Sequence, residues 1–145
     1  MTDLVFVDTN VLVYDQDASE GERQERARAW LTHLWRSRGG RLSFQVLHEF
    51  YSTVTQKLKP GMDRDAARRV VRSLMAWRPL AVNATVLERA WTVQDRYGLS
   101  FWDALVVGAA QVSGCRYLLT EGLQNGQEMD GLTVLSPFER EPDAL

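Results

Sequence analysis

Residues 4–10 have the sequence LVFVDTN, an apolar run of four residues followed by three polar ones. A short apolar run that stops at polar residues is typical of a buried parallel strand. In such folds the ligand binds beyond the carboxyl ends of the strands, which is where these polar residues fall. Asp8, the first of them, is therefore a candidate functional residue.

The rest of the chain continues this alternation of short strands and helices. We expect strands over residues 4–7, 41–44, 79–82, 117–119 and 132–135, and helices over residues 11–14, 22–38, 45–57, 63–76, 84–96 and 101–112. Such alternation with right-handed crossovers predicts an α/β fold, a three-layer α/β/α sandwich with a central five-stranded parallel sheet. We expect one domain over residues 1–138 and a flexible C-terminal tail over residues 139–145.

Two local features of the helices can be predicted as well. Thr9 or Asn10 is expected to cap the first helix. In the helix over residues 22–38 the expected inner face consists of Ala27, Trp30, Leu31, Leu34 and Trp35.

Composition narrows the class of protein. The net charge is −2, which is not the global signature of a nucleic-acid-binding protein, so any nucleic acid must be held locally. We find neither a secretory leader nor an apolar stretch long enough to span a membrane, and we expect a cytoplasmic protein. The single cysteine, Cys115, is expected to be a small packed residue rather than a nucleophile.

Two further acids fall near the same edge of the expected sheet as Asp8. Glu49 lies in the first turns of the helix after the second strand, and Asp103 is the only charged residue of the helix over residues 101–112. Buried carboxylates are costly unless they are paired or bind a metal ion. Because hard oxygen ligands suit Mg²⁺ or Mn²⁺, the three acids predict a divalent-metal site.

Each acid also has a structural explanation. Asp8 could cap the helix that follows it, and Ser100 with Asp103 resembles a capping box. Glu49 lies off the apolar stripe of its helix, as an ordinary solvated glutamate would. Their shared edge is what favours a functional site.

The basic and aromatic residues are less decisive. Arg64, Arg68 and Arg72 follow at helical spacing and form either a solvated face paired with neighbouring acids or a phosphate-binding patch. The five tryptophans lie mostly at core spacings, and we interpret them as packing or dimer contacts before base-stacking platforms.

Four segments together resemble the PIN-domain ribonucleases, and in particular their VapC-type toxins. Residues 4–12 (LVFVDTNVL) resemble the first strand of that family, residues 43–50 (SFQVLHEF) its second acidic motif and residues 99–104 (LSFWDA) its third. The closing segment is similar to residues 119–126 (LTEGLQNG) followed by residues 136–138 (SPF). The match spans residues 4 to 138 in the expected order, which is more specific than any one motif.

The resemblance implies a metal-dependent endoribonuclease that uses Mg²⁺ or Mn²⁺ at Asp8, Glu49 and Asp103. A bound metal ion lowers the pKa of water and neutralises charge on the phosphate. It also implies the toxin component of a type II toxin–antitoxin system, with an RNA substrate, a small antitoxin protein as partner and a homodimer. The alternative is a catalytically weak module that binds RNA or the antitoxin.

The chain departs from the family at one position. The family commonly has a fourth acid two residues after the threonine of the closing segment, and here Gly122 stands there with Glu121 beside it. Either Glu121 takes that place through a small shift of the loop, or the site works with three acids and water. We expect Glu121 to contribute through an outer-shell water. The hydroxyls of Thr9, Ser100 and Thr120 are expected to support the acids or to cap helices.

Overall fold

The computed structural model describes residues 2–145, so Met1 of the expected domain lies outside the described residues. Its centre is a five-stranded sheet with the strand order β2-β1-β3-β5-β4. The strands are short, and they comprise β1 (Val5–Val7), β2 (Gly40–Arg41), β3 (Tyr117–Leu119), β4 (Glu128–Met129) and β5 (Leu132–Leu135). The α/β sandwich with a five-stranded sheet is confirmed.

The fifth strand differs from the expected one. Four strands run parallel, whereas β4 pairs with β5 in the antiparallel direction through the two-residue turn Asp130-Gly131. The segment over residues 79–82 is not a strand of this sheet, because it pairs only through an isolated bridge between Ser43 and Leu80. At this bridge the N–H of Leu80 donates to the carbonyl of Leu42 and the carbonyl of Leu80 accepts from the N–H of Phe44, both at 3.0 Å.

The helices agree with the sequence pattern to within a few residues. They are α1 (Thr9–Gln16), η1 (Ala18–Glu20), α2 (Glu22–Ser37), α3 (Phe44–Ser52), η2 (Thr53–Lys57), α4 (Arg64–Leu74), η3 (Met75–Trp77), α5 (Ala84–Tyr97), α6 (Phe101–Val112) and η4 (Pro142–Ala144). The expected helix over residues 45–57 is thus α3 continued by a π-helical turn, η2.

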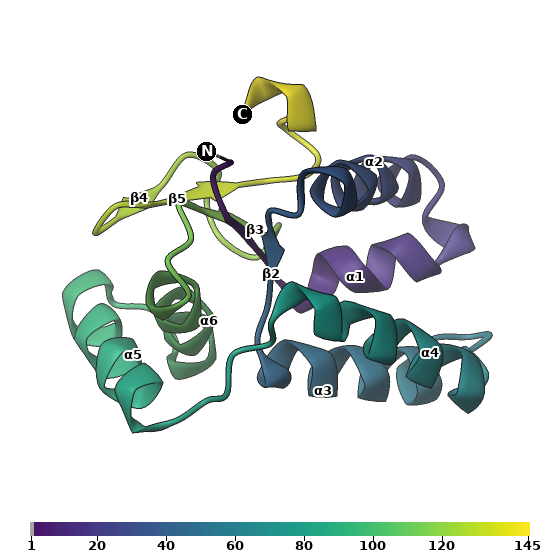
Figure 1. The fold of residues 1–145 in the computed structure, drawn as a ribbon, viewed down its shortest axis with the longest axis horizontal. Coiled ribbons are helices and arrows are strands. Elements are labelled where there is room, and N and C mark those ends of the chain that lie inside the picture. Colours follow the sequence, from purple (N-terminus) through teal and green to yellow (C-terminus); the bar gives the residue numbers. More distant parts are fainter. Residues whose placement is uncertain (1) are drawn as a thin grey trace.

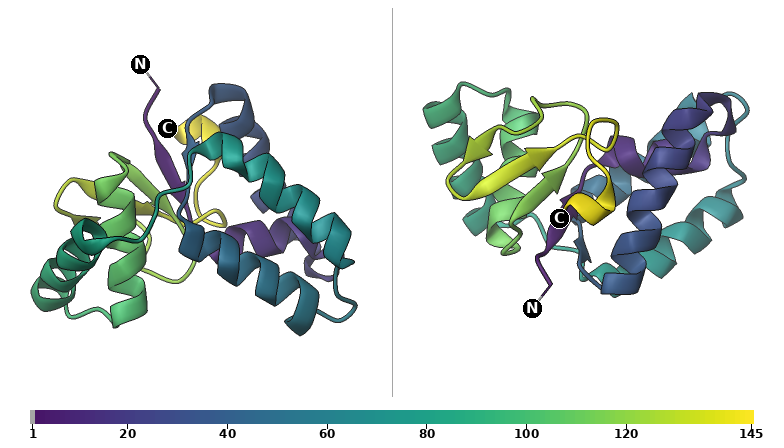
Figure 2. Two further views of the ribbon diagram at one scale, coloured as in Figure 1. Left: turned by 60° about the horizontal axis from the view of Figure 1, so that its bottom comes forward. Right: turned by 90° about the horizontal axis from the view of Figure 1, so that it is seen from above.

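Helices cover both faces of the sheet (Figures 1 and 2). On one side α6 packs against β3 and β5, with α5 outside it. Gly108 allows α6 to pack closely against α5, because a Cβ at position 108 would lie only 3.0 Å from the backbone nitrogen of Ala90 on α5. On the other side α2 lies beside the C-terminal segment, where the indole N–H of Trp30 donates to the carbonyl of Arg140 (2.9 Å). As a result, the carboxyl end of β1 lies between the two helical layers.

The inner face of α2 is shorter than the sequence suggested. Ala27, Trp30, Leu31 and Leu34 are buried as expected, but Trp35 is 42% exposed. The ring of Trp35 packs against the buried ring of Trp77 at a centroid distance of 5.1 Å and is otherwise partly open to solvent.

Cys115 is buried, as expected for a packed residue. Burial raises the pKa of its thiol to about 12, so the thiolate is scarce at neutral pH. Over residues 2–145 the structure contains no helix with the length and hydrophobicity needed to cross a bilayer.

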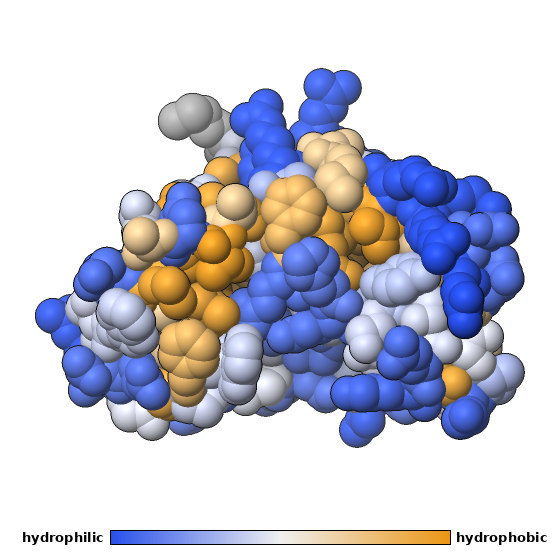
Figure 3. Space-filling model, turned by 90° about the horizontal axis from the view of Figure 1, so that it is seen from below, coloured by the Kyte–Doolittle hydropathy of each residue, from blue (hydrophilic) through white to orange (hydrophobic). Residues whose placement is uncertain are grey.

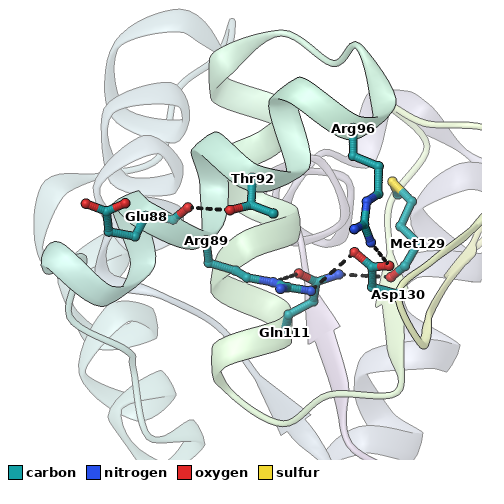
Figure 4. A network of polar contacts seen from close by, with 7 residues as sticks. All are labelled: Glu88, Arg89, Thr92, Arg96, Gln111, Met129 and Asp130. Carbon is teal, nitrogen blue, oxygen red and sulfur yellow. Dashed lines mark hydrogen bonds and ion pairs between the residues drawn. The ribbon is translucent and has the colours of Figure 1, made fainter.

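A polar network holds the β4–β5 turn against α5 and α6 (Figure 4). The carboxylate of Asp130 accepts from Arg96 (2.5 Å) and from Arg89 (3.4 Å), and Gln111 donates to the carbonyl of Met129 (2.9 Å). Asp130 itself has φ +49° and is followed by Gly131 at φ +89°. Two successive residues with positive φ are characteristic of the tight hairpin turn in which Asp-Gly is favoured.

The turn gives a first testable prediction. Asp130→Val should lower the free energy of unfolding by about 1–2 kcal/mol, because a β-branched residue pays the full steric cost of positive φ. Asp130→Asn should cost much less, since Asn tolerates that conformation and only the solvent-exposed ion pairs are lost. Chemical denaturation of both variants measures the difference. Equal losses would mean that the ion pairs, and not the backbone, determine the stability of the turn.

Candidate active site

A cavity of about 480 Å³ opens beyond the carboxyl end of β1, between α1, α3 and α6. Six acidic side chains line it, and no lysine, arginine or histidine does. They are Asp8, Asp17, Glu20, Glu49, Asp103 and Glu121. The three acids singled out in the sequence therefore share one cavity, although they come from three separate segments of the chain. We call it the acidic cavity.

Asp8 connects the sheet to this cavity. Its backbone N–H continues the sheet by donating to the carbonyl of Leu119 (3.1 Å), and its side chain caps α1 by accepting from the N–H of Thr9 (2.7 Å). Asp8, rather than the expected Thr9 or Asn10, is thus the N-cap, because it is the last residue with extended backbone. The second carboxylate oxygen accepts from the hydroxyl of Thr120 (2.9 Å) and, more weakly, from Asn10 (3.4 Å).

The electrostatics of Asp8 are unfavourable to its charge. Burial raises the pKa of the Asp8 carboxyl above its usual value, and the neighbouring carboxylates of Glu49 and Asp103 raise it further. The hydrogen bonds from Thr9 and Thr120 act in the opposite direction and are outweighed. A cation in the cavity would reverse this balance, because it would stabilise all three negative charges.

Glu49 projects from α3 and is held by two donors. The hydroxyl of Thr9 donates to Oε2 and the side-chain amide of Gln45 donates to Oε1, both at 3.0 Å. The position off the apolar stripe, which also suits a solvated glutamate, is what turns this side chain away from the core and toward the cavity. Thr9 therefore connects the first and second acids, since its N–H bonds to Asp8 and its hydroxyl to Glu49.

Asp103 lies in the first turn of α6. Its N–H donates to the hydroxyl of Ser100 (3.2 Å), which is the N-cap of the helix. Ser100 thus acts as a cap and is not among the residues that line the acidic cavity. The carboxylate of Asp103 lines the cavity instead. At the first turn of α6 that charge is also favoured by the helix dipole.

The closing loop reaches the site through Thr120 and Asn10. The buried hydroxyl of Thr120 donates to Asp8 and accepts from the amide of Asn10 (3.0 Å) and the N–H of Gly122 (3.0 Å). Glu121 lines the cavity, and its carboxylate accepts a hydrogen bond from the hydroxyl of Tyr14. Burial, with this hydrogen bond in second place, raises the pKa of Tyr14 to about 12, which keeps the hydroxyl protonated as a donor.

Gly122 leaves space at the position where the resemblance implies a fourth acid. A Cβ at this position would lie 3.4 Å from the hydroxyl of Thr120 and 3.9 Å from the amide nitrogen of Asn10, which are ordinary contacts. The backbone there requires no positive φ. An acidic side chain would therefore fit.

The donor set suits a hard divalent cation, since Asp8, Glu49 and Asp103 offer only carboxylate oxygens next to a roomy cavity. Over residues 2–145 no three His, Cys, Asp or Glu side chains converge tightly enough to form a metal site as they stand. Glu49 is bound to neighbouring side chains, and Asp8 is held by Thr9 and Thr120. The fit thus rests on the chemistry of the donors and on the raised pKa of Asp8.

Several residues that the sequence analysis did not select belong to the site. Asn10 bonds to Asp8, Thr120 and the N–H of Glu121, and Gln45 holds Glu49. Asn10 could have been found as the polar residue two positions after Asp8 in the strand-ending motif. Trp102, which the sequence pattern assigns to packing or dimer contacts, is 63% exposed at the rim of the cavity. Its position next to Asp103 in the sequence was the signal that could have identified it as a residue of the site.

The arginine face of α4 is on the surface. Arg64, Arg68 and Arg72 are all exposed, and the half of the molecule that contains α3 and α4 is mostly hydrophilic in Figure 3, whereas apolar colour gathers on the side of α5 and α6. Arg68 pairs with Asp65 (3.6 Å) and donates to the hydroxyl of Tyr51 (3.2 Å). This residue thus follows the solvated-face interpretation.

Three solved structures resemble this one across most of its length. A toxin–antitoxin complex from Klebsiella pneumoniae has a TM-score of 0.65 and 19% identity, covering 94% of this chain and 99% of that chain. VapC20 of Mycobacterium tuberculosis, a sarcin-ricin-loop-cleaving toxin, has a TM-score of 0.58 and 23% identity, covering 79% and 86%. VapBC2 from Rickettsia felis, bound to a promoter DNA fragment, has a TM-score of 0.60 and 13% identity, covering 92% and 98%.

These three similarities establish a shared fold. A comparison with curated proteins gives no match. The family model of the PIN domain matches residues 5–124, which include all three acids and the start of the closing loop. Because that match extends over most of the chain, this protein belongs to the PIN domain family.

Proposed function

We propose that this protein is a divalent-metal-dependent endoribonuclease that hydrolyses RNA phosphodiester bonds and is the toxin of a type II toxin–antitoxin system. The observation that carries the proposal is the acidic cavity, in which Asp8, Glu49 and Asp103 gather without any basic side chain. Membership of the PIN domain family and the likeness to VapC20, a toxin that cleaves the sarcin-ricin loop, support it.

Asp8, Glu49 and Asp103 are the residues that would hold Mg²⁺ or Mn²⁺. The bound cation would neutralise charge that builds on the phosphate and make water a better nucleophile. The protein supplies the orientation: Thr9 and Thr120 fix the Asp8 carboxylate, and Thr9 and Gln45 fix Glu49. Glu121, which is hydrogen-bonded to Tyr14, would contribute at most through an outer-shell water.

The proposed partners are an RNA substrate, an antitoxin protein and a second copy of the chain, in the cytoplasm. The toxin–antitoxin complexes among the similar structures support an antitoxin partner. Exposed Trp35 and Trp91, at 42% and 47%, offer large side chains that a homodimer could cover.

The proposal is tested by RNA cleavage. Pure protein incubated with structured RNAs should produce discrete fragments in Mg²⁺ or Mn²⁺ and none in EDTA, with 5′-phosphate and 3′-hydroxyl ends. Asp103→Asn should cleave far more slowly under the same conditions. Metal-independent cleavage, or cleavage by the variant equal to that by the wild type, would remove the assignment.

A second candidate function is a catalytically weak module that binds RNA or the antitoxin. The observation that favours it is Gly122, which provides no carboxylate where the family commonly has one, while the neighbouring Glu121 is already bonded to Tyr14. Binding of RNA or antitoxin without metal-dependent cleavage would select this alternative.

Gly122→Asp should tighten Mg²⁺ or Mn²⁺ binding by about tenfold, because affinity for these ions rises with the number of charged oxygen ligands. The site has the space, since a Cβ at this position makes only ordinary contacts. Titration calorimetry measures the affinity, and Gly122→Asn is the control of equal size without charge. If both variants bind the metal as the wild type does, the closing loop lies outside the metal site.

A further inference from the structure

A second cavity, of about 490 Å³, adjoins the acidic cavity, and we call it the flanking cavity. Thr9, Glu49, Thr53 and Trp102 line both, so the two are continuous past the indole of Trp102. The flanking cavity also includes His48, Ser52 and Lys57. An RNA strand that runs from one cavity into the other therefore passes these shared residues, Trp102 among them.

The charge changes across that boundary. The acidic cavity is lined by six carboxylates, whereas the flanking cavity has Glu49 as its only acid and contains Lys57 and His48. Lys57 forms no salt bridge with any residue in the described range 2–145. Its ammonium group is thus available to a phosphate, next to the hydroxyls of Ser52 and Thr53.

Trp102 provides the other half of a nucleotide-binding surface. It is 63% exposed, the highest value among the exposed large hydrophobic residues between positions 2 and 145. Its ring packs edge-on against Phe101, with centroids 5.2 Å apart and an angle of 68° between the planes. An exposed indole beside a free cation is the combination by which proteins hold single-stranded nucleic acid, with the base stacked on the ring and the backbone on the charge.

We propose that the flanking cavity binds the nucleotide next to the cleavage position of single-stranded RNA, with its base stacked on Trp102 and its phosphate at Lys57. The inference rests on the proposed function in taking RNA as the ligand. It adds a reason why a polyanion approaches a cavity of six carboxylates: the neighbouring nucleotide is anchored where the charge is positive.

The test measures binding without cleavage. Fluorescence anisotropy of a labelled 12-nucleotide single-stranded RNA in EDTA compares the wild type with Trp102→Ala and Trp102→Phe. Loss of the stacking ring should weaken binding by about tenfold, and Phe should restore part of it. Trp91→Ala is the matched control, because Trp91 is also exposed but lines neither cavity. Trp91→Ala should bind as the wild type does.

Salt dependence separates the two contacts. Lys57→Ala should reduce the slope of log affinity against log salt concentration by about 0.7, the value for one phosphate contact on a single strand. Trp102→Ala should leave that slope unchanged, because stacking releases no counterions. Lys59→Ala is the control, since Lys59 is an exposed lysine two residues away that lines neither cavity.

Three results would overturn the proposal. They are absence of RNA binding by the wild type, equal weakening by Trp91→Ala and Trp102→Ala, and unchanged RNA affinity of the Trp102 and Lys57 variants with weaker antitoxin binding. The last would assign this surface to a protein partner. The assay contains EDTA and measures binding rather than cleavage. It therefore still tests this proposal if the protein proves not to be a nuclease.

Discussion

Asp8→Asn is expected to abolish metal-dependent RNA cleavage and, at the same time, to raise the Tm of the metal-free protein. The loss of activity should be at least about 100-fold. Changing residues that merely support metal ligands typically costs about 10- to 100-fold, and Asp8 is proposed as a direct ligand. The change is nearly isosteric and keeps the oxygen that caps α1 through the N–H of Thr9, whereas the hydrogen bond from Thr120 to the second oxygen is lost.

The gain in stability follows from the direction of the pKa shift. Burial and the charges of Glu49 and Asp103 raise the pKa of Asp8 above its value in the unfolded chain. A raised acid pKa contributes stability that is present below the unfolded pKa and is lost as pH rises through the folded pKa. At pH 7, well above the pKa of the unfolded chain, Asp8 therefore lowers the free energy of unfolding, and Asn removes that cost.

Thermal unfolding with and without Mg²⁺ measures both effects. The Tm of the wild type should rise with Mg²⁺, because a ligand that binds only the folded state stabilises it. Asp8→Asn should start from a higher Tm and respond weakly to the metal. Asp95→Asn is a suitable control, since Asp95 is an exposed acid on α5 that does not line the acidic cavity. A lower Tm for metal-free Asp8→Asn would contradict the electrostatic account.

Phe50→Ala is expected to lower the free energy of unfolding by about 3–5 kcal/mol, the usual loss when a buried phenylalanine is truncated. Phe50 has no solvent exposure and lies on α3 directly after Glu49. Its burial fixes the rotation of the helix and hence the direction of the Glu49 side chain. Activity of the folded fraction should therefore fall as well.

Urea unfolding gives the size of this effect. Phe44→Ala on the same helix is the matched control, since Phe44 is 37% exposed and should cost less than about 1 kcal/mol. Equal costs for the two variants would mean that burial of α3 does not hold Glu49 in place.

The local sequence pattern predicted the elements that consist mostly of apolar residues. Val5–Val7 and Phe101–Val112 are formed as expected, because strand β1 and the middle of helix α6, residues 104–110, are buried in the interior. The pattern also placed Asp8, Glu49 and Asp103 at the ends of elements that meet at the carboxyl edge of a parallel sheet, and the structure has them around one cavity. Their roles as metal ligands stay a prediction.

Contacts between segments that are far apart in the sequence decided the features that the local pattern did not predict. The hydrogen bond between Asp8 and Thr120 joins residues 112 positions apart, so no local window could indicate it. The segment after Pro79 likewise depends on a distant contact, because it pairs only at Leu80 with Ser43. Strand β4 is different: its pairing with β5 across Asp130-Gly131 is local, and the Asp-Gly pair was a hairpin signal that the sequence analysis did not use.

The tryptophans show most clearly what the local sequence pattern does not predict. Periodicity assigns a large aromatic to packing, and this is right for Trp30 and Trp77, which neighbouring elements cover. Trp102 has a similar local context, yet it is 63% exposed at the start of α6. The sequence by itself thus determined which segments are apolar and which acids end them. The tertiary structure decided which side chains remain in solvent, because burial depends on the elements that come to lie opposite.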